Sequence, residues 1–248
     1  MLTAVVLTKN EEKDITACLK SLSFCDEIIV IDDFSSDKTI KLAKKFTSRI
    51  IPRKLEDNFA SQRNFALTKA RGDWILYVDA DEIVSSSLKQ EITKTIKQNR
   101  KTINGYFIKR EDVFLGKKMH YGETGNIKMV RLARKDKGRW VRPVHEVWEI
   151  RGGIGSLNNP LLHYPHKTIS DLLQKINYYS TVNAKYLHSQ KTAVRQVDIF
   201  LYPTGKFFLN FFIKLGFLDG TAGLIFSLMM SLHSFLTRAK LYFLTQHD

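Results

Sequence analysis

The sequence predicts a doubly wound α/β fold with a mainly parallel sheet, followed by a strongly apolar helical tail at the C-terminus. Three observations support this fold class. Short runs of β-forming apolar residues alternate with amphipathic helical segments in the first part of the chain. Acidic residues directly follow two of these runs, at 32–33 and 79–82. Beyond residue 203, aromatic and aliphatic residues dominate the composition.

The first part of the chain is expected to alternate strand and helix. Leu2–Leu7 predicts a buried parallel strand, and Asn10 is the expected N-cap of the helix that follows it. Glu27–Ile31 predicts the second strand, and the next helix is expected to end at Phe46. The remaining elements of this part are strands at Arg49–Ile51 and Trp74–Val78, a helix at Phe59–Ala70 and a helix capped by Ser85–Ser87. Short connections between such elements favour a parallel sheet.

The rest of the chain shows two other patterns. Short strands and loops separated by glycines are expected over 104–163, and a helix over Thr168–His188. Phe207–Phe217 is mostly aromatic or aliphatic, and Gly220–Thr237 contains no charged residue. The latter stretch would form a helix of roughly 27 Å, just short of a hydrocarbon core of about 30 Å. Helices that lie in a membrane interface or re-enter it are therefore favoured over a clean span, the alternative being packing on the domain or between subunits. The basic residues expected among lipid headgroups are Lys206, Lys214, Arg238 and Lys240.

Length, charge and cysteine content limit the possible classes of protein. A chain of 248 residues can form one α/β domain with an appendage. Its net charge of +14 predicts an anionic partner, namely nucleic acid, lipid headgroups or phosphorylated substrates, unless the charge serves solubility alone. Cys18 and Cys25 form no CxxC pair and are expected to be reduced. The first residues lack a basic segment and a cleavage site, so we expect the active part to stay on the cytoplasmic side of a membrane.

Two acidic clusters, Asp32-Asp33 and Asp79-x-Asp81, are expected at the carboxyl ends of parallel strands. Open α/β sheets bind ligands outside this edge, where the strand order reverses. Two carboxylates separated by one residue can both face Mg²⁺ or Mn²⁺ and leave positions open for the diphosphate oxygens of a nucleotide. Such an ion would stabilise a leaving phosphate as Lewis acid and template. An Asp-x-Asp spacing is common by chance, so its placement at a strand end supplies most of the weight.

Four motifs occur in order along the chain: Thr8-Lys9-Asn10-Glu11, Val30–Thr39, Gln62-Arg63-Asn64 and Trp74–Glu82. Together they resemble glycosyltransferase family 2, which has the GT-A fold. Two later stretches, Arg131–Glu146 and Pro160–Tyr164, look like the lipopolysaccharide-core branch of that family, which includes glucosyltransferases acting on core heptose. The resemblance spans residues 2–188. One position departs from the family pattern, because Phe34 replaces a glycine; a positive φ would strain it, so the local turn is expected to differ.

The resemblance implies a role for each matching residue. The implied donor-binding residues are Thr8, Asn10, Glu11, Asp32, Asp33, Arg63, Asp79 and Ala80. Either member of the first aspartate pair would bind the base and ribose, and Arg63 would contact the nucleotide. The Asp79-x-Asp81 motif would hold the ribose and the metal-diphosphate end of the donor, with Asp81 as a metal ligand and catalytic residue. His163 or His166 is a candidate further ligand, and a structural histidine is the alternative for each.

An inverting transfer also needs a general base beside the acceptor hydroxyl. Glu146 is the candidate, because a carboxylate next to a histidine has suitable chemistry. His145 and Trp148 are the expected acceptor-side residues. The alternatives are an ordinary surface pair for His145 and Glu146, and a core position for Trp148.

The resemblance, together with these residues, implies an inverting, metal-dependent hexosyltransferase, with glucose as the first choice of sugar and lipopolysaccharide core or another lipid-linked saccharide as acceptor. Residues 1–103 are expected to form the nucleotide-sugar-binding half, 104–190 the acceptor-side half of the same catalytic domain, and 191–248 the hydrophobic helical tail. A UDP-sugar is favoured over a GDP-sugar, Mg²⁺ or Mn²⁺ is the expected cofactor, and the acceptor is expected to be a glycolipid or oligosaccharide. The expected location is the cytoplasmic face of the inner membrane, as a peripheral or monotopic protein.

Three other functions are alternatives to this one. A sugar transferase acting on a polyprenyl phosphate would share the fold, the donor site and the tail. A nucleotidylyltransferase is disfavoured, because the Gly-rich phosphate loop is missing after the first strand. A non-catalytic, basic nucleic-acid-binding protein would be expected to carry a helix-turn-helix, RNA-recognition or zinc pattern, and the sequence has none of these. No nucleic-acid partner is therefore expected.

Overall fold

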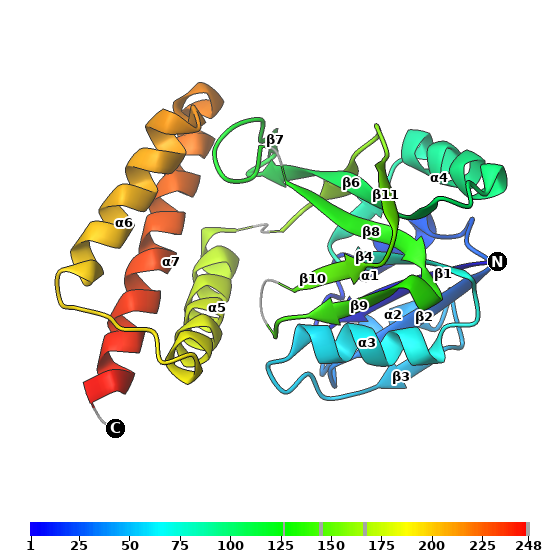
Figure 1. The fold of residues 1–248 in the computed structure, drawn as a ribbon, viewed down its shortest axis with the longest axis horizontal. Coiled ribbons are helices and arrows are strands. Elements are labelled where there is room, and N and C mark those ends of the chain that lie inside the picture. The colour runs from blue at the N-terminus through cyan, green and yellow to red at the C-terminus, as the bar shows by residue number, and fades with distance from the viewer. Residues whose placement is uncertain (126, 144–145, 166–167, 247–248) are drawn as a thin grey trace. The chain divides into compact units, whose positions relative to one another are not determined.

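A computed structural model describes residues 1–125, 127–143, 146–165 and 168–246 of the chain (Figure 1). Its internal contacts divide it into two compact units. Unit 1 comprises Met1–Arg110 and Lys128–His163, and unit 2 comprises Glu111–Ile127 and Tyr164–Asp248. The functional division of the chain into donor half, acceptor half and tail stays a prediction.

Unit 1 is built around one sheet with the strand order β3-β2-β1-β4-β8-β6-β12-β5. Its strands are β1 (Leu2–Thr8), β2 (Glu27–Asp32), β3 (Ile50–Pro52), β4 (Trp74–Asp79), β5 (Glu82–Val84), β6 (Ile103–Phe114, which continues into unit 2), β8 (Lys128–Arg134), β9 (Gly138–Val141), β10 (Val147–Ile150), β11 (Gly153–Ser156) and β12 (Leu161–His163). The first four strands pair in parallel, whereas β8 pairs antiparallel with both β4 and β6. Strands β9 and β10 form a separate antiparallel pair.

Apolar side chains on both faces of the sheet pack against other elements. The helices of unit 1 are α1 (Ile15–Ser21), α2 (Thr39–Ala43), α3 (Phe59–Lys69) and α4 (Ser86–Gln98), with a 3₁₀ turn at Lys135–Lys137. Val6 and Val30 point to the face covered by α1, α2 and α4. Their neighbours Val5 and Ile29 point to the opposite face, where they pack with α3 and the β9–β10 pair. The doubly wound, mainly parallel α/β fold is therefore confirmed.

Two local expectations were wrong at the ends of β1 and β2. Helix α1 begins at Ile15 and not after Asn10, because Asn10 takes a positive φ of 54°. Its side-chain oxygen accepts a hydrogen bond from the backbone N–H of Ser36 at 2.8 Å and so joins two loops. Phe34 does adopt the left-handed conformation, with φ of 52°, although we expected strain to exclude it. Phe34 is 64% exposed, so its ring is not enclosed by the fold.

Unit 2 contains three long helices. They are α5 (Ile169–Ser189), α6 (Asp198–Phe208) and α7 (Gly220–Gln246), with a π-helical turn at Leu209–Ile213, a 3₁₀ turn at Gly216–Asp219 and the short strand β7 (Lys117–Lys118). Helix α7 packs against both α5 and α6, and Figure 1 shows α6 and α7 side by side, joined by the two turns. Leu172 and Ile176 of α5 meet Phe226 of α7 in a small apolar core.

Besides its apolar core, unit 2 buries some polar residues and exposes several large apolar ones. Asn210 and Asp219 are buried, at 0% and 2% exposure. By contrast, Phe200, Ile213 and Phe243 are 71%, 74% and 66% exposed. In the described part of the chain, one helical stretch, Gly216–Gln246, is long and apolar enough to cross a membrane, with a mean hydropathy of 1.3.

Three of the four basic residues of the tail make contacts within unit 2, and their placement among lipid headgroups stays a prediction. Lys206 pairs with Glu123 at 2.7 Å. Lys240 donates to the backbone and side-chain oxygens of Asn177, each at 2.8 Å. The guanidinium of Arg238 lies 3.9 Å from the ring centre of Tyr202. These contacts bind the three cations to other residues of unit 2.

Candidate functional site

Thr8, Asp32 and Asp79 lie at the carboxyl edge of three adjacent parallel strands. Strand β1 lies between β2 and β4, with Thr8 opposite Asp32 and Leu7 opposite Asp79. The strand order reverses between β1 and β4, since β2 and β3 extend the sheet on the other side of β1. Ligands of open α/β sheets bind at such a reversal. The structure thus brings both acidic clusters to the expected edge.

The loops at this edge are held together by the aspartates of the first cluster. Asp32 accepts hydrogen bonds from the backbone N–H and the hydroxyl of Ser35, at 3.0 and 2.5 Å. Asp33 pairs with Lys9 at 2.7 Å and accepts the N–H of Leu55 at 3.0 Å. Both carboxylates are nearly buried, so the loops that would enclose a donor are ordered by the predicted donor-binding residues themselves.

The other predicted donor residues surround this edge. Thr8 and Ala80 are buried, at 5% and 4% exposure, whereas Asn10 is exposed. The N–H of Glu11 donates to the hydroxyl of Thr39 at 2.8 Å, which joins the loop after β1 to the start of α2. The donor-binding roles of all these residues stay predictions.

Asp79 belongs to a cluster of five charged side chains. Arg63 of α3 donates through Nη2 to Asp79 at 2.8 Å and through Nε to Glu146 at 2.9 Å. Arg131 of β8 donates through Nη2 to the second oxygen of Asp79 at 2.7 Å and to Glu82 at 3.0 Å. Glu82 in turn accepts the backbone N–H of Asp79 at 2.8 Å. The candidate base and the Asp79-x-Asp81 motif, which lie far apart in the sequence, thus share one arginine.

Burial and charge oppose each other in this cluster. Burial alone would raise the pKa of Asp79, but the guanidinium groups of Arg131 and Arg63 hold that pKa well below its usual range. Burial also raises the pKa of Glu82, and Arg131 offsets this only in part. The pKa of Arg63 is raised, because its carboxylate partners outweigh its own burial. Asp79 is therefore ionised, and each of its two oxygens binds one arginine.

Arg63 is also fixed by aromatic side chains. Its guanidinium lies 4.8 Å from the ring centre of Trp140 and 5.4 Å from that of Tyr77. The hydroxyl of Tyr77 donates to the backbone oxygen of Arg63 at 2.6 Å. Trp148 stacks on Trp140 with 5.3 Å between ring centres and is only 3% exposed. Trp148 is thus a core residue, and no exposed ring face remains for the acceptor contact that we expected of it.

Asp81 and His163, the two predicted metal ligands, come close together. Strand β12 pairs with β5 so that His163 lies opposite Glu82, next to the motif. The Nε2 atom of His163 is 3.5 Å from Oδ2 of Asp81. Among the described residues, no third histidine, cysteine or acidic side chain joins them in a group that could hold a metal ion. One carboxylate and one imidazole fit a divalent ion whose other ligands come from a diphosphate and water.

Three further candidates need comment. His145 and His166 lie outside the described residues. Glu123 is another carboxylate that could be compared with Glu146 as a base, and it belongs to unit 2. Burial would raise the pKa of Glu123, but hydrogen bonding and charge from Lys206 lower it. It is thus an ionised partner of the tail and a poor alternative to Glu146.

Arg131 and Glu82 belong to this cluster, but they were not predicted as site residues. Arg131 interrupts the apolar run Met129–Ala133 of β8, and it is 3% exposed. A charged residue in the middle of a buried strand requires a buried partner, so this position was the available signal. The sequence alone did not show which carboxylate would be that partner.

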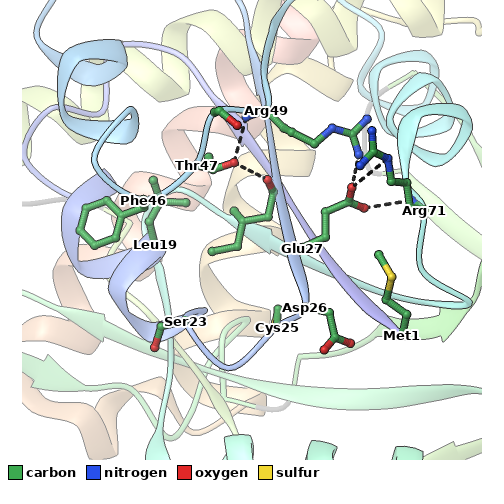
Figure 2. Close-up of a pocket in the computed structure, with 12 residues that line it drawn as sticks. Met1, Leu19, Ser23, Cys25, Asp26, Glu27, Phe46, Thr47, Arg49 and Arg71 are labelled. Atoms are coloured by element: carbon green, nitrogen blue, oxygen red, sulfur yellow. Dashed lines mark hydrogen bonds and ion pairs between the residues drawn. The ribbon is translucent and has the colours of Figure 1, made fainter.

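A cavity of about 520 Å³ lies at the opposite edge of the sheet, around Glu27 at the start of β2 (Figure 2). Figure 2 shows Arg49 and Arg71 reaching the Glu27 carboxylate. Glu27 also accepts the hydroxyl of Thr3 at 2.6 Å. The carboxylate is already bonded within the fold, and Asp32 lies at the far end of the same strand. This cavity is therefore separate from the candidate site.

Sequence comparison identifies relatives over almost the whole chain. An uncharacterized glycosyltransferase of Rickettsia bellii is 29% identical over 97% of this chain and 85% of its own length. The lipopolysaccharide core biosynthesis glycosyltransferase LpsC of Rhizobium meliloti is 28% identical over 97% of this chain and 92% of its own length.

Comparison of folds finds solved structures that resemble this chain. Residues 1–349 of TarS from S. aureus, in complex with UDP-GlcNAc, are 16% identical with a TM-score of 0.48, covering 100% of this chain and 92% of that one. The family profile described as "Glycosyl transferase family 2" matches residues 3–147, which is more than half of the chain. The chain therefore belongs to glycosyl transferase family 2 and is a glycosyltransferase.

Proposed function

We propose that this chain is an inverting, metal-dependent glycosyltransferase that moves a hexose from a UDP-sugar to a lipid-linked saccharide. Glucose is the first choice of sugar, and lipopolysaccharide core is the first choice of acceptor. One observation supports the chemistry above all: Arg63 holds the candidate base Glu146 and the motif residue Asp79 at the same sheet edge. The name of the Rhizobium meliloti relative supports the choice of acceptor.

The donor would bind where β1 and β4 diverge. Asp32 and Asp33 lie on the side of β2, where the base and ribose are expected, and Asp79 and Asp81 lie on the side of β4. Asp81 and His163 would hold a divalent ion, which would stabilise the charge of the leaving diphosphate. The two ionised arginines reduce the negative charge of the cluster and so favour an anionic ligand nearby.

Glu146 would act as the general base. Its side chain is 17% exposed, so an acceptor hydroxyl can approach it from solvent. Deprotonation of that hydroxyl raises its nucleophilicity as it attacks the anomeric carbon, on the face opposite the leaving diphosphate. The result is one displacement with inversion at that carbon.

Unit 2 would attach the enzyme to a membrane surface. Apolar side chains cover its exposed faces, from Phe200 on α6 through Ile213 in the turn to Phe243 on α7. Water is a poor solvent for such a surface, whereas lipid acyl chains accommodate it. The described cysteines are both free, which fits a reducing compartment and supports a location on the cytoplasmic face of the inner membrane.

A panel of UDP- and GDP-sugars tests this proposal. Each would be incubated with the full-length protein, Mn²⁺ and truncated lipopolysaccharide, and products would be identified by mass spectrometry. A parallel series with a polyprenyl phosphate tests the second candidate, which the exposed apolar surface of unit 2 equally supports. Transfer of a hexose to the saccharide is the expected result. Transfer to the polyprenyl phosphate alone would replace our acceptor, and absence of transfer from every sugar would refute the proposal.

A further inference from the structure

Arg63 has two possible roles, which the geometry separates. The family resemblance makes it a contact of the nucleotide. In the structure, its side chain is 4% exposed, and two of its three nitrogens already bind carboxylates. Its third nitrogen, Nη1, is buried and has no hydrogen-bond partner within the described part of the chain. Any direct contact with a nucleotide would therefore have to use that one enclosed atom.

The fixed parts of this arrangement are Arg63 and Asp79. Arg63 packs over two aromatic rings, and the hydroxyl of Tyr77 holds its backbone oxygen. Asp79 is held from its other side by Arg131. Glu146, in contrast, immediately precedes the short strand β10, and Arg63 is the one hydrogen-bond partner of its carboxylate recorded among the described residues.

The planar guanidinium sets the spacing between the two carboxylates. It offers Nε to one and Nη2 to the other, which an ammonium group cannot do in the same geometry. Without the cation between them, two carboxylates this close would repel each other. The fork of Arg63 therefore both attracts Glu146 to the sheet edge and fixes its direction.

We propose that Arg63 is a positioning residue for the general base. Given the proposed function, Arg63 affects the rate of sugar transfer by placing Glu146 and not by binding the nucleotide. Asp79, anchored by Arg131, is the fixed point from which Arg63 places the base beside the donor.

Arg131 supplies a matched control. Arg131→Lys and Arg63→Lys each keep a buried cation beside Asp79, and each lose a fork that joined two carboxylates. Only the fork of Arg63 reaches Glu146. Each variant would be made alone and combined with Glu146→Gln, and its fold checked by circular dichroism.

Two measurements test the inference. UDP affinity, measured by calorimetry with Mn²⁺, should stay within a few-fold of wild type in Arg63→Lys. The kcat for UDP release from UDP-glucose, with truncated lipopolysaccharide as acceptor, should fall at least tenfold in that variant. The double variant Arg63→Lys/Glu146→Gln should be no more than a few-fold slower than Glu146→Gln alone, whereas the effects of Arg131→Lys and Glu146→Gln should multiply.

Three kinds of result would contradict the positioning role of Arg63. A loss of UDP affinity of a hundredfold in Arg63→Lys, with kcat unchanged at saturating donor, would make Arg63 a nucleotide contact. Multiplying effects of Arg63→Lys and Glu146→Gln would show that Arg63 does not act through Glu146. If the wild type transfers sugar and Glu146→Gln is just as active, Glu146 is not the base. The base assignment and this inference would then both be refuted. Failure of the wild type to bind UDP or GDP would instead refute the proposed donor, and the inference would fall with it.

Discussion

The Nε2 atom of His163 lies 3.5 Å from Oδ2 of Asp81. This relationship depends on the antiparallel pairing of β12 with β5, which places a strand from the end of unit 1 beside the Asp79-x-Asp81 turn. Each oxygen of the Asp79 carboxylate already accepts a hydrogen bond from an arginine. We therefore expect a metal site here to use Asp81 and His163 before Asp79.

The first prediction follows from this pair. Asp81→Asn and His163→Gln should each abolish most sugar transfer, and EDTA should do the same to the wild type. Mn²⁺ should raise the melting temperature of the wild type in the presence of UDP but not that of Asp81→Asn. Full activity in EDTA would exclude a metal role for this pair, provided that circular dichroism shows an intact fold.

The second prediction concerns Glu146. Glu146→Gln keeps the size of the side chain but cannot accept a proton, so kcat should fall by at least ~10²-fold. The measurement is the initial rate of UDP release at saturating donor and acceptor. Glu123→Gln is the control, because Glu123 is bound to Lys206 in unit 2. A Glu146→Gln enzyme within a few-fold of wild type would assign the base elsewhere.

Much of unit 1 could be predicted because its signals are local. The apolar run Leu2–Leu7 and the acidic residues after 31 and 78 define strands and their ends without reference to the rest of the chain. Parallel pairing of neighbouring strands then brings Asp32 and Asp79 to one edge. Family 2 membership could likewise be inferred, because the motifs that carry it lie at these strand ends.

Other features could not be predicted because they depend on distant partners. Asn10 looks like a helix cap, but its oxygen bonds across to Ser36, and the helix starts later. Trp148 follows the candidate base in sequence, yet the alternation of β10 directs it into the core. The partners of Arg131 come from two other strands, and periodicity contains no information on that pairing.

The third prediction concerns Phe34, whose φ of 52° is unfavourable for a residue with a Cβ atom. Phe34→Gly removes this strain but increases the entropy of the unfolded chain, so the free energy of unfolding should rise by roughly 0.5–1 kcal/mol relative to Phe34→Ala. Both variants lose the exposed ring, so the difference between them isolates the backbone effect. Urea unfolding gives the comparison. Equal stabilities would mean that this turn does not impose strain in solution.

The fourth prediction uses the thiols. Burial, together with the charge of Asp26, raises the pKa of Cys25 to about 12, and burial raises the pKa of Cys18 well above its ordinary value. A raised pKa leaves less reactive thiolate at any pH below it. Iodoacetamide at pH 8 should therefore label neither residue in the native protein and both in guanidinium chloride. Rapid labelling of the native protein, detected by mass spectrometry, would show that these thiols are accessible and ionised.

The last prediction concerns the exposed apolar surface of unit 2. Phe200 and Ile213 are 71% and 74% exposed, on α6 and in the turn that follows it. If they enter a bilayer, Phe200→Glu combined with Ile213→Glu should weaken binding to anionic liposomes at least tenfold. Complete burial of each apolar side chain in the bilayer would contribute about 1.5–3 kcal/mol to the binding free energy, and the variant loses this contribution. The new carboxylates are also repelled by anionic headgroups. Sedimentation with liposomes measures this binding.

Ile154→Glu is the control for this experiment, since Ile154 is an exposed apolar residue of unit 1, at 39%. It should leave liposome binding unchanged. Full-length protein should prefer anionic over neutral liposomes, and salt should reduce that preference, because the net charge of +14 is screened. If the double variant binds as the wild type does, the exposed helix faces serve another contact. Light scattering would then compare the molar mass of the wild type with that of the double variant. An oligomeric wild type and a monomeric variant would show that these residues form a contact between subunits.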